Sequence, residues 1–188
     1  MLQPQATIYL SQLESILAVN RLQSPACLTS MYREFHRVER RGDQPLYICV
    51  DREAPAYVLG ALTHVCHPAP IVFSYSEGEV GIGCQNPFGW GKGPISWTVS
   101  VNDPGQFRRY VRVTARTYET EAFKPADLDR IVPPKLGLSD MVSLDGNLPA
   151  WALVSIAMAY HGQVAAVALE GSVAITHVAD IRLGTTIS

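Results

Sequence analysis

The chain lacks most of the short motifs that mark redox, metal and nucleotide enzymes. Its four cysteines stand alone at Cys27, Cys49, Cys66 and Cys84, and no two of them form a Cys-x-x-Cys pair. Isolated cysteines favour buried thiols in a reduced chain. There is no nucleophile elbow, zinc motif or dinucleotide fingerprint. The glycine-rich stretch NPFGWGKGP (86–94) has neither the spacing of a P-loop nor its trailing Ser or Thr.

Charge is also scarce, and long apolar runs are missing. Charged residues make up 17% of the 188 residues, and the net charge is −2. This balance gives no overall attraction to nucleic acid, so any basic surface must be local. The sequence has no run of about 18 uninterrupted apolar residues. The first residues, MLQPQATIYL, have no basic stretch followed by an apolar run. We therefore expect no membrane span, no signal peptide and a cytoplasmic protein.

The chain does have a hydrophobic fraction of 47%, enough for a core, and a short sequence pattern that occurs twice. Residues 51–57 read DREAPAY, and residues 145–151 read DGNLPAW. Each stretch leads into an apolar helix that ends at His67 or His161, and then into a strand, a Glu-Gly turn and a second strand. This order predicts an α+β fold with two related strand–helix–hairpin units, mainly antiparallel sheet and N-terminal helices.

The repeat also predicts how the chain is divided. We expect an N-terminal helical segment (1–45), a first unit (46–90), an insertion of strands and a short helix (91–137) and a second unit (138–188). Together these four parts are predicted to form one compact domain, a pseudo-dimer within a single chain.

One predicted strand, FRRYVRVTARTYE (107–119), has a pattern suited to nucleic acid. Successive strand residues alternate between faces, so Val111, Val113 and Ala115 should point into the core. Guanidinium groups bind phosphate, and aromatic rings stack on bases. The predicted phosphate- or RNA-binding residues on this strand and in the glycine-rich loop are Arg108, Tyr110, Arg112, Arg116, Trp90 and Lys92. The alternative is a solvated face or a dimer contact.

The second unit also resembles a known family. It contains GNLPAW (146–151), an Ala-Tyr-His at the end of the predicted helix, a Thr-His after the hairpin and a Gly-Thr-Thr-Ile tail (184–187). These features resemble the CRISPR-associated Csx-three (Crn-three) ring nucleases. The resemblance covers residues 138–188 well and residues 46–86 poorly, and the rest of the chain lies outside it.

The resemblance implies a metal-dependent phosphodiesterase that linearises cyclic tetra-adenylate, a second messenger of type III CRISPR defence. It implies that His161 and Glu170 are catalytic and that they bind Mn²⁺ together with His177. In the first unit, His67 and Glu77 would be degenerate counterparts. Two imidazoles and a carboxylate suit such a metal. The residues alone also allow a helix-end histidine, a turn glutamate and a surface histidine without metal.

Three functions stay open at this point. The chain could be a metal-dependent ring nuclease, a non-catalytic protein that binds cyclic oligoadenylate or RNA, or a structural subunit of a CRISPR ribonucleoprotein effector complex. In both units Glu-Gly replaces the Asp-Pro-Arg-Leu-Gly of the family, which favours the second and third functions. The His–Glu–His set favours the first. The expected partners are cyclic oligoadenylate or RNA, other effector subunits, or another copy of the chain.

Overall fold

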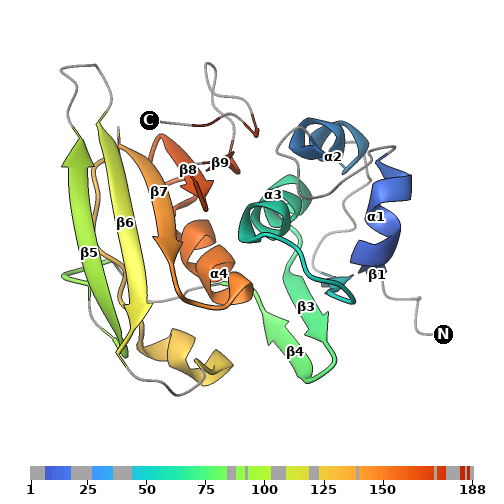
Figure 1. Cartoon of the computed structure of the whole chain (residues 1–188), viewed down its shortest axis with the longest axis horizontal. Helices are drawn as coiled ribbons and strands as arrows, with labels where there is room; N and C mark the ends of the chain where they lie inside the picture. Colours follow the sequence, from blue (N-terminus) through green and yellow to red (C-terminus); the bar gives the residue numbers. More distant parts are fainter. Residues whose placement is uncertain are drawn as a thin grey trace.

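Two β-sheets with two helices between them form the framework of the molecule in the computed structural model (Figure 1). The structure describes residues 7–17, 27–35, 44–83, 88–91, 93–102, 109–118, 123–138, 140–171, 173–176, 183–184 and 186. Within these ranges, no helix is both long enough and apolar enough to cross a membrane.

The first sheet contains four strands in chain order. These are β1 (Thr7–Tyr9), β2 (Leu46–Cys49), β3 (Ile71–Tyr75) and β4 (Gly78–Gly81). Helix α1 (Leu10–Ile16) follows β1, helix α2 (Cys27–Phe35) packs against α3, and helix α3 (Ala56–Cys66) connects β2 to β3. Strands β1, β2 and β3 are parallel, and β4 returns antiparallel to β3 through the Glu-Gly turn.

The second sheet contains five strands. These are β5 (Ile95–Asn102), β6 (Tyr110–Thr117), β7 (Met141–Gly146), β8 (Ala166–Leu169) and β9 (Val173–Ala174). The 3₁₀ helix η1 (Pro125–Arg130) lies between β6 and β7, and helix α4 (Ala150–Tyr160) connects β7 to β8. Strands β6, β7 and β8 are parallel, whereas β5 and β9 are antiparallel to their neighbours.

The α+β class predicted from the sequence is confirmed, but the sheets are mixed rather than mainly antiparallel. Four of the seven strand pairings described are parallel. The physical reason is the connection through α3 and through α4, because a helical crossover brings the chain back to the same end of the sheet. The short hairpin turns are visible in the sequence, whereas the parallel partners lie far apart along the chain.

The two halves use the same series of elements. The order and pairing directions of β1 to β4 are the same as those of β6 to β9, and α3 and α4 occupy the same connection. Each of these helices has 11 residues and begins directly after a proline, Pro55 or Pro149. This arrangement agrees with the repeat in the sequence, although an origin by duplication stays a prediction.

The units share one hydrophobic core, because α3 and α4 pack against each other in the middle of the molecule (Figure 1). Gly60 of α3 approaches the second unit so closely that a Cβ atom would lie 2.8 Å from Leu169 and 3.0 Å from Ile175. Both helices are apolar around most of their circumference, as helices buried on all sides must be. The inner face of the second sheet is therefore covered, whereas Arg112 and Arg116 of β6 are exposed on the opposite face.

Candidate functional site

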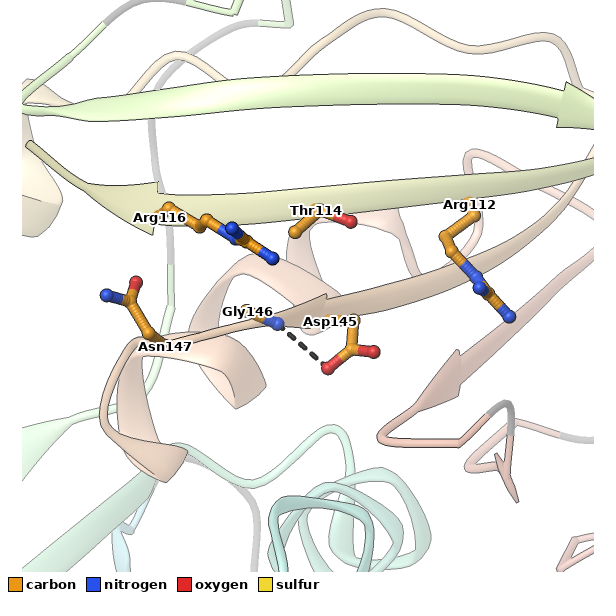
Figure 2. Close-up of a pocket in the computed structure, with 6 residues that line it drawn as sticks. All are labelled: Arg112, Thr114, Arg116, Asp145, Gly146 and Asn147. Atoms are coloured by element: carbon orange, nitrogen blue, oxygen red, sulfur yellow. Dashed lines mark hydrogen bonds between the residues drawn. The ribbon is translucent and has the colours of Figure 1, made fainter.

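A groove of about 390 Å³ lies on the outer face of the second sheet, over β6 and the end of β7 (Figure 2). Alternation along β6 brings every second side chain to this face. The parallel register places Thr114 opposite Asp145, so the end of β7 continues the same surface. The residues that line the groove are Arg112, Thr114, Arg116, Asp145, Gly146 and Asn147.

Two positive charges in this groove are free to meet a ligand. Arg112 and Arg116 are exposed, as the strand pattern predicts, and neither has an ion-pair partner among the described residues. The alternate positions Val111, Val113 and Ala115 are buried, which confirms the predicted inner face. Arg108 lies outside the described residues.

The floor and the rim of the groove depend on Gly146 and Asn147. Any side chain at Gly146 would collide with the carbonyl oxygen of Ala115, so glycine is required for β7 to run this close to β6. The Asn147 side chain accepts a hydrogen bond from the Thr117 amide at 3.0 Å and donates one to the Thr117 hydroxyl at 3.2 Å. These two bonds fix the Asn147 amide at the rim.

The carboxylate of Asp145 lies in the middle of the groove, and its counterpart in the first unit has a different environment. Asp145 accepts the Gly146 amide at 2.9 Å. Asp51 instead accepts hydrogen bonds from the amide of Ser11, at 2.8 Å, and from the Ser11 hydroxyl. These bonds lower the pKa of Asp51, with the hydroxyl of Ser11 as the largest cause.

The strand register explains the difference between the two aspartates. When the pairing of β1 with β2 is extended beyond the ends of the two strands, Ser11 falls opposite Asp51. In the second unit, Thr114 lies opposite Asp145 in the same way. In the first unit, however, the chain turns into α1 at Leu10, and Asp51 bonds to the start of that helix. In the second unit, β6 continues as a strand to Thr117. The open groove described above therefore belongs to the second sheet.

Sequence reasoning missed the β7 part of this groove, namely Asp145, Gly146 and Asn147. A usable signal was present, because the polar stretch Asp-Gly-Asn directly follows the apolar residues of a strand. Ligands of sheets that contain parallel strands often bind at the carboxyl ends of those strands. Asp145 was used to define the repeat and was not predicted to bind a ligand.

The structure corrects the prediction for Tyr110. This residue stands on the same face of β6 as the arginines, yet its side chain is only 3% exposed. It packs in a small cluster with Ala166, Ala168 and Ala174. These short side chains leave room that the ring fills, so Tyr110 contributes to stability and has no exposed face on which a base could stack.

Trp90 is 95% exposed, but it is not among the residues that line the groove. The loop that carries it is anchored at Gly89, whose amide donates to Pro133 at 3.0 Å and whose carbonyl accepts from Lys135 at 2.9 Å. Phe88 stacks on Tyr160 with ring centroids 4.9 Å apart. The backbone just before Trp90 is therefore held in place, while the Trp90 side chain is exposed. Lys92 lies outside the described residues.

The predicted catalytic residues His161 and Glu170 are not brought together within the chain. The His161 ring lies 5.1 Å from His67 and 4.8 Å from His64, measured between centroids, where the two central helices end. Glu170 accepts the amide of Ala56, the first residue of α3, at 2.7 Å. Because His67 follows the last residue of α3, the two predicted residues lie at opposite ends of this helix, roughly 16 Å apart.

This separation bears on the Mn²⁺ site that the family resemblance implies. Two side chains at opposite ends of α3 cannot bind one metal ion, and His177 lies outside the described residues. In the part of the chain that the structure describes, no three His, Cys, Asp or Glu side chains form a group that could hold a metal. Glu77 is exposed in the turn between β3 and β4. The described residues do not fit the implied metal site, and we derive no metal chemistry from them.

Comparison with known proteins adds one finding. The model of the family described as CRISPR-associated protein (Cas_csx3) matches residues 116–188. No curated protein and no solved structure gives a significant match. The matched region begins at Arg116 near the end of β6 and continues through β7, α4, β8 and β9. It therefore contains most of the groove, whereas Arg112 and Thr114 lie just before it.

Proposed function

Because residues 116–188 match the model of the CRISPR-associated Csx-three family, we propose that the groove binds a cyclic oligoadenylate messenger of type III CRISPR defence. The observation that carries this proposal is the pair of exposed arginines, Arg112 and Arg116, on one face of β6. The two residues are four positions apart on the strand, so their Cα atoms lie about 13 Å from each other. Two guanidinium groups at this spacing can bind phosphates of one short, compact phosphodiester.

The other groove residues suit the same ligand. The Thr114 hydroxyl can donate to a phosphate oxygen, and the fixed Asn147 amide offers polar atoms at the rim. A volume of about 390 Å³ falls within the usual range of small-molecule sites, so it accommodates part of an oligonucleotide ring. The net charge of −2 for the whole chain means that this attraction is local.

The proposal is limited to binding. Cleavage by His161 and Glu170 would require their side chains to meet at the scissile phosphate, and α3 separates them within one chain. Ring-nuclease activity with Mn²⁺ is therefore an outcome of the experiment below and is not part of the proposed function.

A second function, an RNA-binding or structural subunit of a CRISPR ribonucleoprotein, is favoured by one observation. Trp90 is 95% exposed on an anchored loop. A tryptophan held in this way loses little freedom when it stacks on a base or packs against a neighbouring subunit.

The test measures how cyclic tetra-adenylate and short single-stranded RNA bind to wild type and to Arg112→Ala over a range of salt concentrations. Cyclic tetra-adenylate is also incubated with wild type, with and without Mn²⁺, and analysed for linear product. Loss of one charge-assisted phosphate contact should weaken binding about tenfold or more. It should also reduce the slope of the logarithm of affinity against the logarithm of salt concentration by about one. Arg130→Ala is the matched control, since the Arg130 side chain is 70% exposed and lies outside the groove.

Each outcome separates the alternatives. Tighter binding of cyclic tetra-adenylate than of RNA, lost in Arg112→Ala and kept in Arg130→Ala, supports the proposal. Binding of RNA alone supports the ribonucleoprotein function. Linear product that forms with Mn²⁺ restores the ring-nuclease hypothesis. An unchanged affinity and salt slope in Arg112→Ala would overturn the groove as the binding site.

A further inference from the structure

An acidic side chain in a groove for phosphate needs an explanation. The Asp145 carboxylate lies between Arg112 and Arg116, on the side of β7 that faces the groove (Figure 2). A carboxylate repels a phosphate at short range, so its presence weakens the binding of any ligand that offers only phosphates. It strengthens the binding of a ligand that also brings a hydrogen-bond donor, because a bond to a charged acceptor is stronger than one to a neutral acceptor.

Asp145 has acceptor capacity to spare. Its Oδ1 atom accepts the Gly146 amide, and the described residues offer no further hydrogen bond or ion pair to the carboxylate. An ionised carboxylate has room for about four donors. Asp145 is also only partly buried, so its second oxygen can be reached by a ligand in the groove.

In the first unit, the carboxylate equivalent to Asp145 already has hydrogen-bond donors within the chain. Asp51 occupies the equivalent register position, and the amide and hydroxyl of Ser11 engage its two oxygens. In the second unit, the equivalent position across the strand pair is Thr114, and no hydrogen bond joins its hydroxyl to Asp145 within the described residues. The donor that Ser11 supplies in the first unit is therefore left for a ligand to supply in the second.

From these observations we infer that Asp145 selects ribonucleotides over deoxyribonucleotides by accepting a hydrogen bond from a ribose 2′-hydroxyl. This inference rests on the proposed function of the groove. The 2′-hydroxyl is the ligand donor that adjoins the phosphate in the backbone, and it distinguishes RNA from DNA. A carboxylate flanked by two phosphate-binding arginines is placed to meet that group rather than a more distant base.

The experiment compares cyclic tetra-adenylate with its cyclic deoxyribose analogue on wild type, Asp145→Ala and Asp145→Asn. Wild type should prefer the ribose ligand by about tenfold. Asp145→Ala should lose this preference while its affinity for the deoxyribose ligand stays the same or rises, because a repulsive charge is removed. Asp145→Asn should keep part of the preference, since its amide oxygen still accepts. Glu79→Gln, a charge change on exposed β4, should behave as wild type.

Failure of this inference can be distinguished from failure of the proposed function. If wild type binds neither ligand, the proposed function fails. If wild type binds both equally, or if Asp145→Ala and Asp145→Asn keep the full preference, the inference is overturned but the groove is still supported as the binding site.

A further comparison with ribose tetra-inosinate, which lacks the adenine amine, tests whether that amine is the donor to Asp145. If wild type discriminates against inosinate and Asp145→Ala does not, the base amine replaces the 2′-hydroxyl. Circular dichroism of each variant checks that it is folded.

Discussion

Arg109 directly precedes β6 and Arg112 lies on that strand, yet their side chains have different partners. Arg112 is exposed and has no ionic partner in the described part of the chain, whereas Arg109 forms two hydrogen bonds, at 2.8 and 2.9 Å, with the fully buried carboxylate of Asp140. The Gly137 amide donates to the same carboxylate at 2.7 Å. The first arginine is therefore available for binding, and the second stabilises the fold.

The pKa of Asp140 makes the structural role of Arg109 testable. Burial acts to raise this pKa, but the hydrogen bonds from Arg109 and Gly137 and the charge of Arg109 outweigh burial, so the pKa is below its usual value of 3.8. A lowered pKa means that the pair contributes stability above the unfolded-state pKa and loses it as pH falls through the folded-state value.

We therefore expect Arg109→Met to lower the free energy of unfolding by about 3 kcal/mol at neutral pH, because it leaves a buried carboxylate without its cation. The loss should shrink as pH falls, since burial without the guanidinium raises the pKa of Asp140 in the variant, and the wild-type pair loses its contribution as pH falls through its lowered folded-state pKa. Urea unfolding at several pH values measures this change. Arg130→Met, at an exposed pair, is the control, and an equal loss at all pH values would contradict the prediction.

At the scale of elements, helix α3 depends on a residue from the other unit. No side chain of its own N-terminal region caps α3. Glu170, in the turn between β8 and β9, supplies a carboxylate to the first amide of the helix, and it does so with a φ of +33°. A negative charge at this end of the helix is also favoured by the helix dipole.

Glu170→Ala should lower the free energy of unfolding by about 1 kcal/mol, the usual cost of losing an N-terminal cap. Glu170→Gln should cost less, because its amide oxygen can still accept the Ala56 amide. The matched control is Glu77→Ala, at the corresponding Glu-Gly turn of the first hairpin, where the side chain is exposed. Denaturant unfolding is the measurement, and equal stability of the two alanine variants would refute the capping role.

At the scale of the whole molecule, the shared core predicts that the two units unfold together. Trp97 lies on β5 and Trp151 on α4, so their fluorescence reports on the second half, whereas Trp90 is 95% exposed in the loop before β5. Gly60 lies in the first unit and contacts Leu169 and Ile175 of the second. A change at Gly60 therefore tests whether stability passes from one unit to the other.

Gly60→Val should destabilise the protein by about 1–3 kcal/mol through overpacking and should shift the tryptophan-monitored transition. The far-UV circular dichroism transition should shift equally, because one cooperative core has one transition. Gly81→Val on β4 is the control, since a Cβ atom at Gly81 meets nothing within 4 Å. A tryptophan transition that stays in place while circular dichroism changes would show two independent units.

The sequence by itself determined what depends on neighbours along the chain. Two apolar stretches, each bounded by a proline and a histidine, specify α3 and α4, and the Glu-Gly pairs specify the hairpin turns. Alternation in β6 was enough to predict the exposure of Arg112 and Arg116, because strand periodicity is a local property.

Only the tertiary structure decided what each of these side chains meets. Tyr110 has the periodicity of an exposed residue and is buried because alanines from β8 and β9 leave space beside it. His161 and Glu170 follow one another closely in sequence, yet α3 separates them, because packing of the two units brings each to a different end of that helix. Asp51 and Asp145 share a sequence pattern but differ in availability, since the chain turns into α1 beside one and continues as β6 beside the other. Side-chain environment depends on segments that are distant in the chain, and a local pattern carries no information about them.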